Sequence, residues 1–209
     1  FQPEYVVAKA AWDCTHTEQM PKDYDYQKMI RNLLALGHYS VLEFAVFSFR
    51  ISGVSRACTA QLTRHRIASY AQQSQRYNKY VEGLEVVVPD SVGKFKERFT
   101  TLALQTQEFY KELLDNGVPA EDARYILPIG AESVINIQMN ARTLREFFAK
   151  RRCLKTQWEL RLIADHMFMI ASSVAPNIFS GKIIPCGEKK ECKGCARNVS
   201  KTNDTTTSS

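Results

Sequence analysis

The chain has 209 residues, of which 44% are hydrophobic, 24% charged and 11% aromatic, with a formal net charge of +6. This balance excludes wholesale disorder and suits one domain with a sizeable core. No apolar run approaches the roughly 20 residues that span a bilayer, and the start of the chain lacks the pattern of a secretory signal, so we expect a cytoplasmic protein with reduced thiols. The moderate positive charge fits either a mildly basic surface or an anionic partner such as a nucleotide, a folate or a nucleic acid.

Helical spacing of apolar residues dominates the chain. It predicts helices over 24–36, 54–64, 91–115, 119–128, 141–151 and 156–173. Runs of β-branched and aromatic residues predict strands over 41–51 and 84–88, the first broken at Ser52-Gly53 and the second ended by Pro89. Strands and helices do not alternate regularly and no G-x-G-x-x-G occurs, so the pattern indicates an α+β protein without a Rossmann site. We expect a catalytic domain over residues 1–180, and a polar tail with cysteines over 181–209.

The segment from Arg64 to Tyr77 is unusual for a purely structural one. Three cationic or near-cationic side chains stand together at the predicted end of a helix, and hydroxyls, amides and Arg76 follow. Guanidinium groups bind phosphates through two hydrogen bonds, and hydroxyl and backbone N–H groups complete such sites. Clustered like charges cost energy unless an anion compensates them. The segment is therefore either an anion-binding site or a solvated basic loop.

Six residues of this segment stand at the fixed positions of a longer signature, Arg-His-Arg-x2-Ser-x4-Ser-x-Arg. They are Arg64, His65, Arg66, Ser69, Ser74 and Arg76. With this signature the chain resembles the flavin-dependent thymidylate synthases. The resemblance implies helices packed around a small, mostly antiparallel sheet, and methylation of dUMP to dTMP. It further implies FAD as cofactor, NADPH and methylenetetrahydrofolate as co-substrates, and a homotetramer with no membrane or nucleic-acid partner.

The resemblance extends in register from about His38 to Ile170. The matching motifs are His38-x-Ser40-x-x-Glu43, Gln61, Ala123-Arg124-x-x-Leu127-Pro128, Asn140-x-Arg142, Arg151 and Gln157-Trp158-Glu159. By this resemblance the flavin would be held by His38, Ser40, Glu43, Arg64, His65, Arg66, Gln72, Asn140, Arg142 and Glu146. The nucleotide would be held by Gln61, Arg64, Gln72, Gln73, Ser74, Gln75, Arg76, Arg124 and Arg151.

Arg151 is the residue that the resemblance assigns to catalysis. It would face N3 and O2 of the uracil ring and stabilise the ionised ring, so that C5 becomes reactive without a covalent thiol. A guanidinium suits this role because it always carries its charge. From the charge pattern alone, Lys150-Arg151-Arg152 is an ordinary solvated run.

A cysteine nucleophile is the alternative route to the same chemistry. Pro185-Cys186 offers a superficial match, but it lies in a Gly/Lys-rich tail, and we expect Cys58 to occupy an apolar helix position. The tail spacing Cys186-x5-Cys192-x2-Cys195 supplies three of the four ligands that structural zinc needs, and His166 would be a fourth only if the fold brought it back. We expect a reducible tail and no metal.

Two other functions compete with the synthase. The net charge and the arginine clusters also suit a nucleic-acid-binding module, although the arginines do not form one helical stripe with stacking aromatics. A relative that modifies another pyrimidine nucleotide, or uses another one-carbon donor, would carry much the same motifs.

Overall fold

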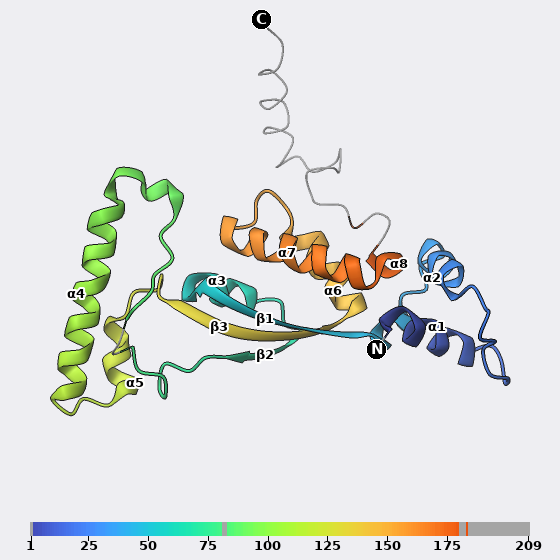
Figure 1. The fold of residues 1–209 in the computed structure, drawn as a ribbon, viewed down its shortest axis with the longest axis horizontal. Helices are drawn as coiled ribbons and strands as arrows, with labels where there is room; N and C mark the ends of the chain where they lie inside the picture. The colour runs from blue at the N-terminus through green and yellow to red at the C-terminus, as the bar shows by residue number, and fades with distance from the viewer. Residues whose placement is uncertain (1, 81–82, 180–182, 184–209) are drawn as a thin grey trace, which may run out of the picture. The chain divides into compact units, whose positions relative to one another are not determined.

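The computed structural model describes residues 2–80, 83–179 and 183, drawn in colour in Figure 1. These residues form two compact units. The first unit is made of residues within Phe1–Phe49, Ile67–Ser69 and Gln138–Ser209, and the second of Arg50–Arg66 and Tyr70–Ile137. Among the described helices, every one is too short or too polar to cross a bilayer.

The first unit is built from helices at the two ends of the chain. They are α1 (Pro3–Asp13), α2 (Tyr26–Ala35), the 3-10 turn η1 (Ser40–Phe44), α6 (Ala141–Arg151), α7 (Trp158–Val174) and α8 (Pro176–Phe179). Its core holds the fully buried Phe148, whose ring meets Phe168 at 5.3 Å and Phe179 at 5.7 Å between centroids. Burying each such ring contributes about 1.5–3 kcal/mol, so this cluster anchors α6 against α7 and α8.

A polar network joins the first and last helices of this unit. The buried carboxylate of Glu4 accepts hydrogen bonds from the backbone N–H of Asn177 at 2.6 Å and from its side-chain amide at 2.8 Å. Asn177 Oδ1 in turn accepts from Arg31 at 2.7 Å. Because an unsatisfied buried carboxylate is costly, these bonds fix α1, α2 and α8 in one arrangement.

The second unit contains the segment with the arginine-rich signature. Its helices are α3 (Arg56–Leu62), η2 (Asp90–Phe95), α4 (Lys96–Asp115), α5 (Ala120–Ala123) and η3 (Arg124–Ile126). Ser55 caps α3 through its hydroxyl, which accepts a hydrogen bond from the backbone N–H of Cys58 at 3.0 Å. Such a cap fixes where α3 starts, and therefore where the signature that follows it begins.

The described strands form one three-stranded sheet in the order β1-β3-β2. Their bounds are β1 Val46–Ser55, β2 Ser69–Gln72 and β3 Glu132–Asn140. Ala141 N–H bonds to Ala45 O at one end of the β1/β3 pair, and Arg56 N–H bonds to Ala131 O at the other, so these strands run antiparallel. An α+β fold with a small antiparallel sheet is confirmed.

The helices agree with the sequence better than the strands do. Helix α6 has the predicted bounds, and α2, α4 and α7 lie within about five residues of theirs. The predicted strand over 84–88 is wrong, because within the described residues it makes only an isolated antiparallel bridge between Val86 and Ala131. The predicted break at Ser52-Gly53 is also wrong. Strand β1 continues through it, with Gly53 at a φ of 68° that only glycine adopts without strain.

Five described elements were not predicted from the sequence: α1, η1, β2, β3 and α8, and η1 replaces the start of the strand predicted over 41–51. Strand β3 carried a clear signal, because Ser133, Ile135, Ile137 and Met139 alternate with more exposed residues along it and are all buried. Period-two alternation of this kind is typical of a strand with one buried face. The tail over 184–209 lies outside the described residues, so the expected boundary near residue 180 stays a prediction.

Candidate functional site

In the first unit, two motifs that lie far apart in the sequence meet at the start of α6. Arg142 Nη1 donates to Glu43 Oε1 at 2.7 Å, across 99 positions of the chain. The backbone explains this meeting, since the N–H of Ala141 donates to the carbonyl of Ala45 at 2.8 Å. Turn η1 and the first turn of α6 are thereby held together. Two of the residues predicted to hold a flavin thus form one ion pair.

Asn140 is the N-cap residue of α6. Its side-chain oxygen accepts a hydrogen bond from the backbone N–H of Thr143 at 2.9 Å, which caps the helix. Only its NH2 group therefore remains to donate to a ligand. His38, Ser40 and Glu146, the other residues of the predicted flavin set in this unit, are exposed.

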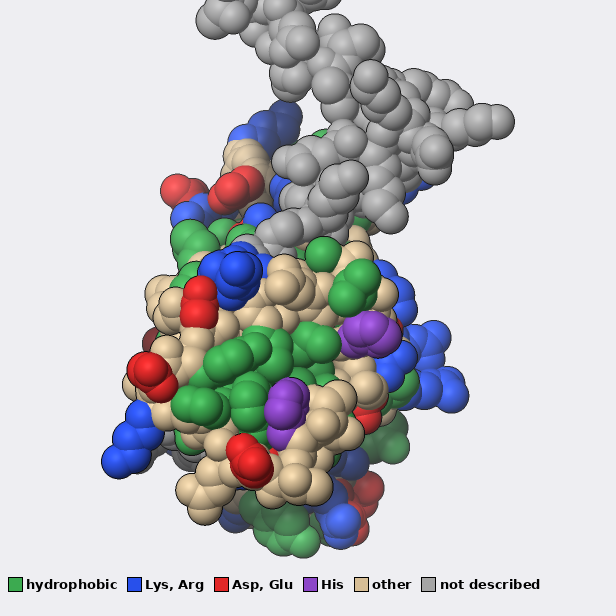
Figure 2. Space-filling model, turned by 90° about the vertical axis from the view of Figure 1, so that its right-hand side faces the viewer, with side chains coloured by type: hydrophobic (Ala, Val, Ile, Leu, Met, Phe, Trp, Pro, Cys, Tyr) green, Lys and Arg blue, Asp and Glu red, His purple; other side chains and the backbone are tan. Residues whose placement is uncertain are grey.

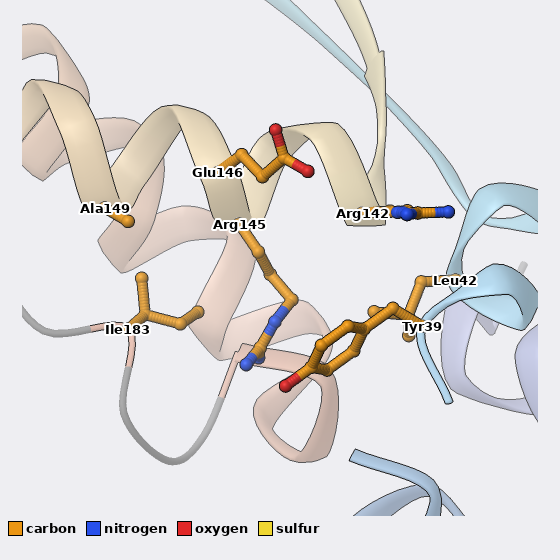
Figure 3. Close-up of a pocket in the computed structure, with 7 residues that line it drawn as sticks. All are labelled: Tyr39, Leu42, Arg142, Arg145, Glu146, Ala149 and Ile183. Atoms are coloured by element: carbon orange, nitrogen blue, oxygen red, sulfur yellow. The ribbon is translucent and has the colours of Figure 1, made fainter. Parts of the chain in front are cut away.

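A pocket of about 230 Å³ lies beside this ion pair (Figure 3). Its lining residues are Tyr39, Leu42, Arg142, Arg145, Glu146, Ala149 and Ile183. Figure 3 shows the Arg145 side chain extending from α6 towards the Tyr39 ring, and the guanidinium carbon lies 5.9 Å from the ring centroid. Arg145 also donates to the backbone carbonyl of Ile178, and burial lowers its pKa from the ordinary arginine value.

Arg145 and Tyr39 were missed by the sequence analysis. Arg145 stands three residues after Arg142 on α6, a spacing that places two side chains on neighbouring positions of one helix face. This spacing was the available signal, and it would have extended the predicted cationic set along α6 by one residue.

At the end of α6, two consecutive arginines have opposite environments. Arg152 Nε bonds to Asp165 at 2.6 Å, and its guanidinium lies 3.8 Å from the centroid of the Phe168 ring. Arg151 Nε is buried, and within the described residues it has no hydrogen-bond partner. A buried N–H donor without a partner is rare in folded proteins and points to a missing ligand. The residue predicted to be catalytic is therefore a desolvated donor at a helix end.

In the second unit, the signature folds as a tight loop after α3. The backbone N–H groups of Arg64 and His65 bond to the carbonyls of Gln61 and Leu62 at 3.2 and 3.1 Å. The Tyr70 hydroxyl lies 3.0 Å from the carbonyl of Leu62 and 2.6 Å from that of His65, and it closes the loop from β2. Arg64 and Arg66 are exposed here, as is Gln61, whereas His65 is buried.

Gln72 points its side-chain amide into the second unit. The amide nitrogen donates to the hydroxyls of Thr59 at 2.8 Å and Ser133 at 3.2 Å. These bonds engage both amide hydrogens, so the Gln72 side chain offers only its oxygen to a ligand. Gln73 pairs its backbone N–H with Val134 O at 2.8 Å, and its carbonyl accepts from the Arg56 side chain at 3.2 Å.

Three residues predicted to hold the nucleotide's phosphate and sugar lie around one acidic residue. Arg76 Nη2 lies 2.7 Å from Glu121 Oε2, and Arg124 Nε donates to the Glu121 carbonyl at 2.9 Å. The Ser74 hydroxyl accepts from the backbone N–H of Arg76 at 3.2 Å. The structure therefore brings Ser74, Arg76 and Arg124 together, and it adds Glu121, which the sequence analysis missed. Gln75 lies between Ser74 and Arg76 and is half-buried.

Apolar side chains gather on the face that carries α1 and α2 (Figure 2). The hollow there has a volume of about 380 Å³, and its apolar lining includes Tyr24, Met29, Leu33 and Leu36. His38 follows α2 directly and is exposed. This hollow contains no residue of the predicted site.

The thiols do not offer a nucleophile in the described part of the chain. Cys58 is fully buried in α3, which confirms the expected apolar helix position, and Cys153 is buried after α6. Cys14 is exposed but belongs to neither set of predicted site residues. Pro185-Cys186 and the three tail cysteines lie outside the described residues. Among residues 2–80, 83–179 and 183, no cluster of His, Cys, Asp and Glu could hold a metal ion.

Both units offer groups that suit a flavin dinucleotide and a nucleotide. Arg64 and Arg66 are exposed guanidinium groups on a tight loop, and such groups bind phosphate oxygens through paired hydrogen bonds. Arg142 offers another cation beside a pocket, and Arg151 offers a buried donor without a partner in the described structure. Within each unit, these donors suit a ligand that carries phosphates or a ring with hydrogen-bond acceptors.

Comparison with known proteins places these residues in a family. A family model described as "Thymidylate synthase complementing protein" matches residues 1–177. The chain is 44% identical over 187 residues to a flavin-dependent thymidylate synthase of Geobacter sulfurreducens. The matched stretch covers 85% of this chain and 81% of that protein.

Two further relatives with the same description come from distant organisms. The protein of Pyrococcus abyssi is 44% identical over 164 residues, 75% of this chain and 67% of its own length. That of Clostridium tetani is 38% identical over 202 residues, 85% of this chain and 81% of its own. The match spans both compact units and includes the signature and α6.

Proposed function

The chain belongs to the family of flavin-dependent thymidylate synthases, and we propose that it methylates dUMP to dTMP through the residues described above. Methylenetetrahydrofolate is the one-carbon donor and NADPH the reductant. FAD, when bound, supplies the hydride that reduces the transferred carbon to a methyl group. The protein's own task is to bind these molecules and to make the pyrimidine reactive.

Arg151 carries the proposed activation of the pyrimidine. Uracil C5 is a weak nucleophile, and it becomes reactive when negative charge in the ring is stabilised. A guanidinium supplies this stabilisation at any accessible pH, and it acts most strongly where water is excluded. The observation that supports this role is the buried Arg151 Nε, which has no partner among the described residues.

Ser74, Arg76 and Arg124 form the proposed phosphate site. Two guanidinium groups and a hydroxyl in one cluster are a typical donor set for a phosphate monoester. Their common neighbour Glu121 supports this assignment, because Arg76 contacts its carboxylate and Arg124 its backbone carbonyl. Gln61, the Gln73 backbone and Gln75 complete the proposed contacts to the base and sugar.

Each unit has its own residues that we propose to contact a flavin. Arg64, His65, Arg66 and the remaining oxygen of Gln72 come from the second unit. The donors and acceptors from the first unit are His38, Ser40, Glu43, Asn140, Arg142 and Glu146. The Arg142–Glu43 pair supports this assignment, because it fixes the direction of a guanidinium beside the pocket of Figure 3.

The decisive experiment combines a spectrum with an assay of the product. Purified protein should show the absorbance of bound oxidised flavin. With dUMP, NADPH and methylenetetrahydrofolate it should form dTMP and release tritium from dUMP labelled at C5. No flavin after reconstitution, together with no dTMP, would overturn the proposal. Turnover of dCMP in place of dUMP would favour a relative that modifies another pyrimidine. Oligonucleotide binding with steep salt dependence and no turnover would favour the nucleic-acid module.

Self-association as a homotetramer is part of the same proposal. Helix α4 supports it, because Leu102 and Phe109 lie two helical turns apart on one face, are both exposed and offer an apolar surface to another copy. The mass in solution tests this directly. Function in the cytoplasm also stays a prediction.

A further inference from the structure

Glu121 joins the two arginines of the proposed phosphate site. Its carboxylate lies 2.7 Å from Arg76, and its backbone carbonyl accepts a hydrogen bond from Arg124 at 2.9 Å. A carboxylate oxygen at this distance from a guanidinium makes the same kind of charge-assisted hydrogen bond that a phosphate oxygen makes. The Glu121 carboxylate therefore makes with Arg76 the contact that a phosphate oxygen would make.

The strength of this ion pair determines what Glu121 can do. The Arg76 and Glu121 side chains are 52% and 49% exposed, so water screens their attraction. Ion pairs of this exposure contribute little to stability. Such a pair orders the guanidinium but does not lock it, and an incoming dianion can take the place of the carboxylate.

The charge of the cluster changes with this exchange. The Glu121 carboxylate offsets the positive charge of Arg76 in the empty protein. A phosphate that binds Arg76 must displace the carboxylate and then lie close to it, which costs affinity through like-charge repulsion. Removing only the charge of Glu121 should therefore strengthen binding of phosphate groups.

We propose that Glu121 is a resident anion of Arg76 that the phosphate of the nucleotide substrate displaces on binding. The exchange keeps Arg76 ordered in the empty protein and lowers the affinity for the nucleotide, so that nucleotide is released more readily. This inference rests on the proposed function, because it takes Arg76 and Arg124 to be the phosphate-binding residues.

Calorimetric titration of the flavin-loaded protein with dUMP tests the exchange. Glu121→Gln should bind dUMP about three- to fivefold more tightly than the unchanged protein, since up to about 1 kcal/mol of competing ion pair is removed. Deoxyuridine, which lacks the phosphate, should bind both proteins equally. In turnover, the KM for dUMP should fall by a similar factor while kcat stays within twofold.

Asp122→Asn is the matched control. Asp122 is the next residue of α5, is also exposed and loses the same charge. Its dUMP affinity should change by less than twofold, and the Tm of both variants should show that the fold is intact. Equal gains for the two variants would mean a general charge effect and would overturn the proposal. Unchanged or weaker binding of dUMP by Glu121→Gln would also overturn it. Failure of the unchanged protein to bind dUMP would instead contradict the proposed function.

Discussion

Arg151 of the first unit and Arg76 of the second show two ways in which one chain prepares a guanidinium. Arg76 is half-exposed and lies 2.7 Å from a carboxylate. Arg151 has its Nε buried, and nothing among the described residues accepts a hydrogen bond from it. A screened and paired cation suits reversible binding, whereas a guanidinium with a buried N–H donor left available can bind charge that develops next to it.

The neighbour of Arg151 explains how this difference is maintained. Arg152 bonds to Asp165 and lies against the ring of Phe168, so the carboxylate on the facing helix α7 is already engaged. One arginine of the pair thus fixes the end of α6, and the next one keeps a donor for a ligand.

The largest expected effect is on Arg151. Arg151→Lys should lower kcat for dTMP formation by about a hundred- to a thousandfold, because a compact ammonium cannot make the two-pronged contact of a guanidinium. Lys150→Arg is the control, since Lys150 is exposed on the same helix and this exchange also keeps the positive charge. It should keep kcat within twofold. If the kcat of Arg151→Lys stayed within tenfold of that of the unchanged protein, Arg151 would not have the catalytic role that distinguishes it from Arg76.

An intermediate effect is expected at Arg142, which is paired like Arg76. Because Arg142 and Glu43 are 46% and 49% exposed, Arg142→Met should cost less than about 1 kcal/mol of unfolding free energy. Loss of a charge-assisted bond to the flavin should weaken FAD binding about tenfold or more. Titration of the apoprotein with FAD measures this, and Arg98→Met on α4 gives the same change of charge at an exposed site outside the predicted set. Equal FAD affinity in the two variants would contradict the flavin role.

The smallest effect at neutral pH is expected at Tyr110. This residue tests the stability of the fold and is not among the proposed site residues. Burial raises the pKa of the Tyr110 hydroxyl above its ordinary value of about 10. The unfolded chain therefore loses this proton at a lower pH than the folded one. Tyr110 thus favours folding below pH 10, and this contribution is lost as the pH rises from about 10 through the raised pKa.

Tyr110→Phe should stay within about 1 kcal/mol of the unchanged protein at pH 7 and lose less stability above pH 10. Chemical denaturation at pH 7 and above pH 10 measures both. Tyr110→Phe lacks the hydroxyl. Any alkaline loss of activity that the variant shares with the unchanged protein therefore cannot come from Tyr110. An equal loss of stability in both proteins would show that the hydroxyl does not govern the alkaline limit.

The sequence predicted helices α2, α4, α6 and α7, and it supplied the residues of the proposed site. Local signals sufficed for α6, because its apolar spacing and its cap at Asn140 lie within a dozen residues. The signature from Arg64 to Arg76 was recognisable for the same reason, as its fixed residues stand close together. Strand β3 also had a readable alternation, which the sequence analysis missed.

Only the tertiary structure decided which cations have partners. Glu43 and Arg142 meet across 99 residues, and Glu121 reaches Arg76 from helix α5. The buried, unpaired state of Arg151 Nε likewise depends on the packing around the end of α6. Pairing between distant segments follows from how the chain folds back on itself, and spacing along the sequence carries no signal for it. The chain by itself therefore determined which charges are present, and the fold determined which of them are screened, shared or left available.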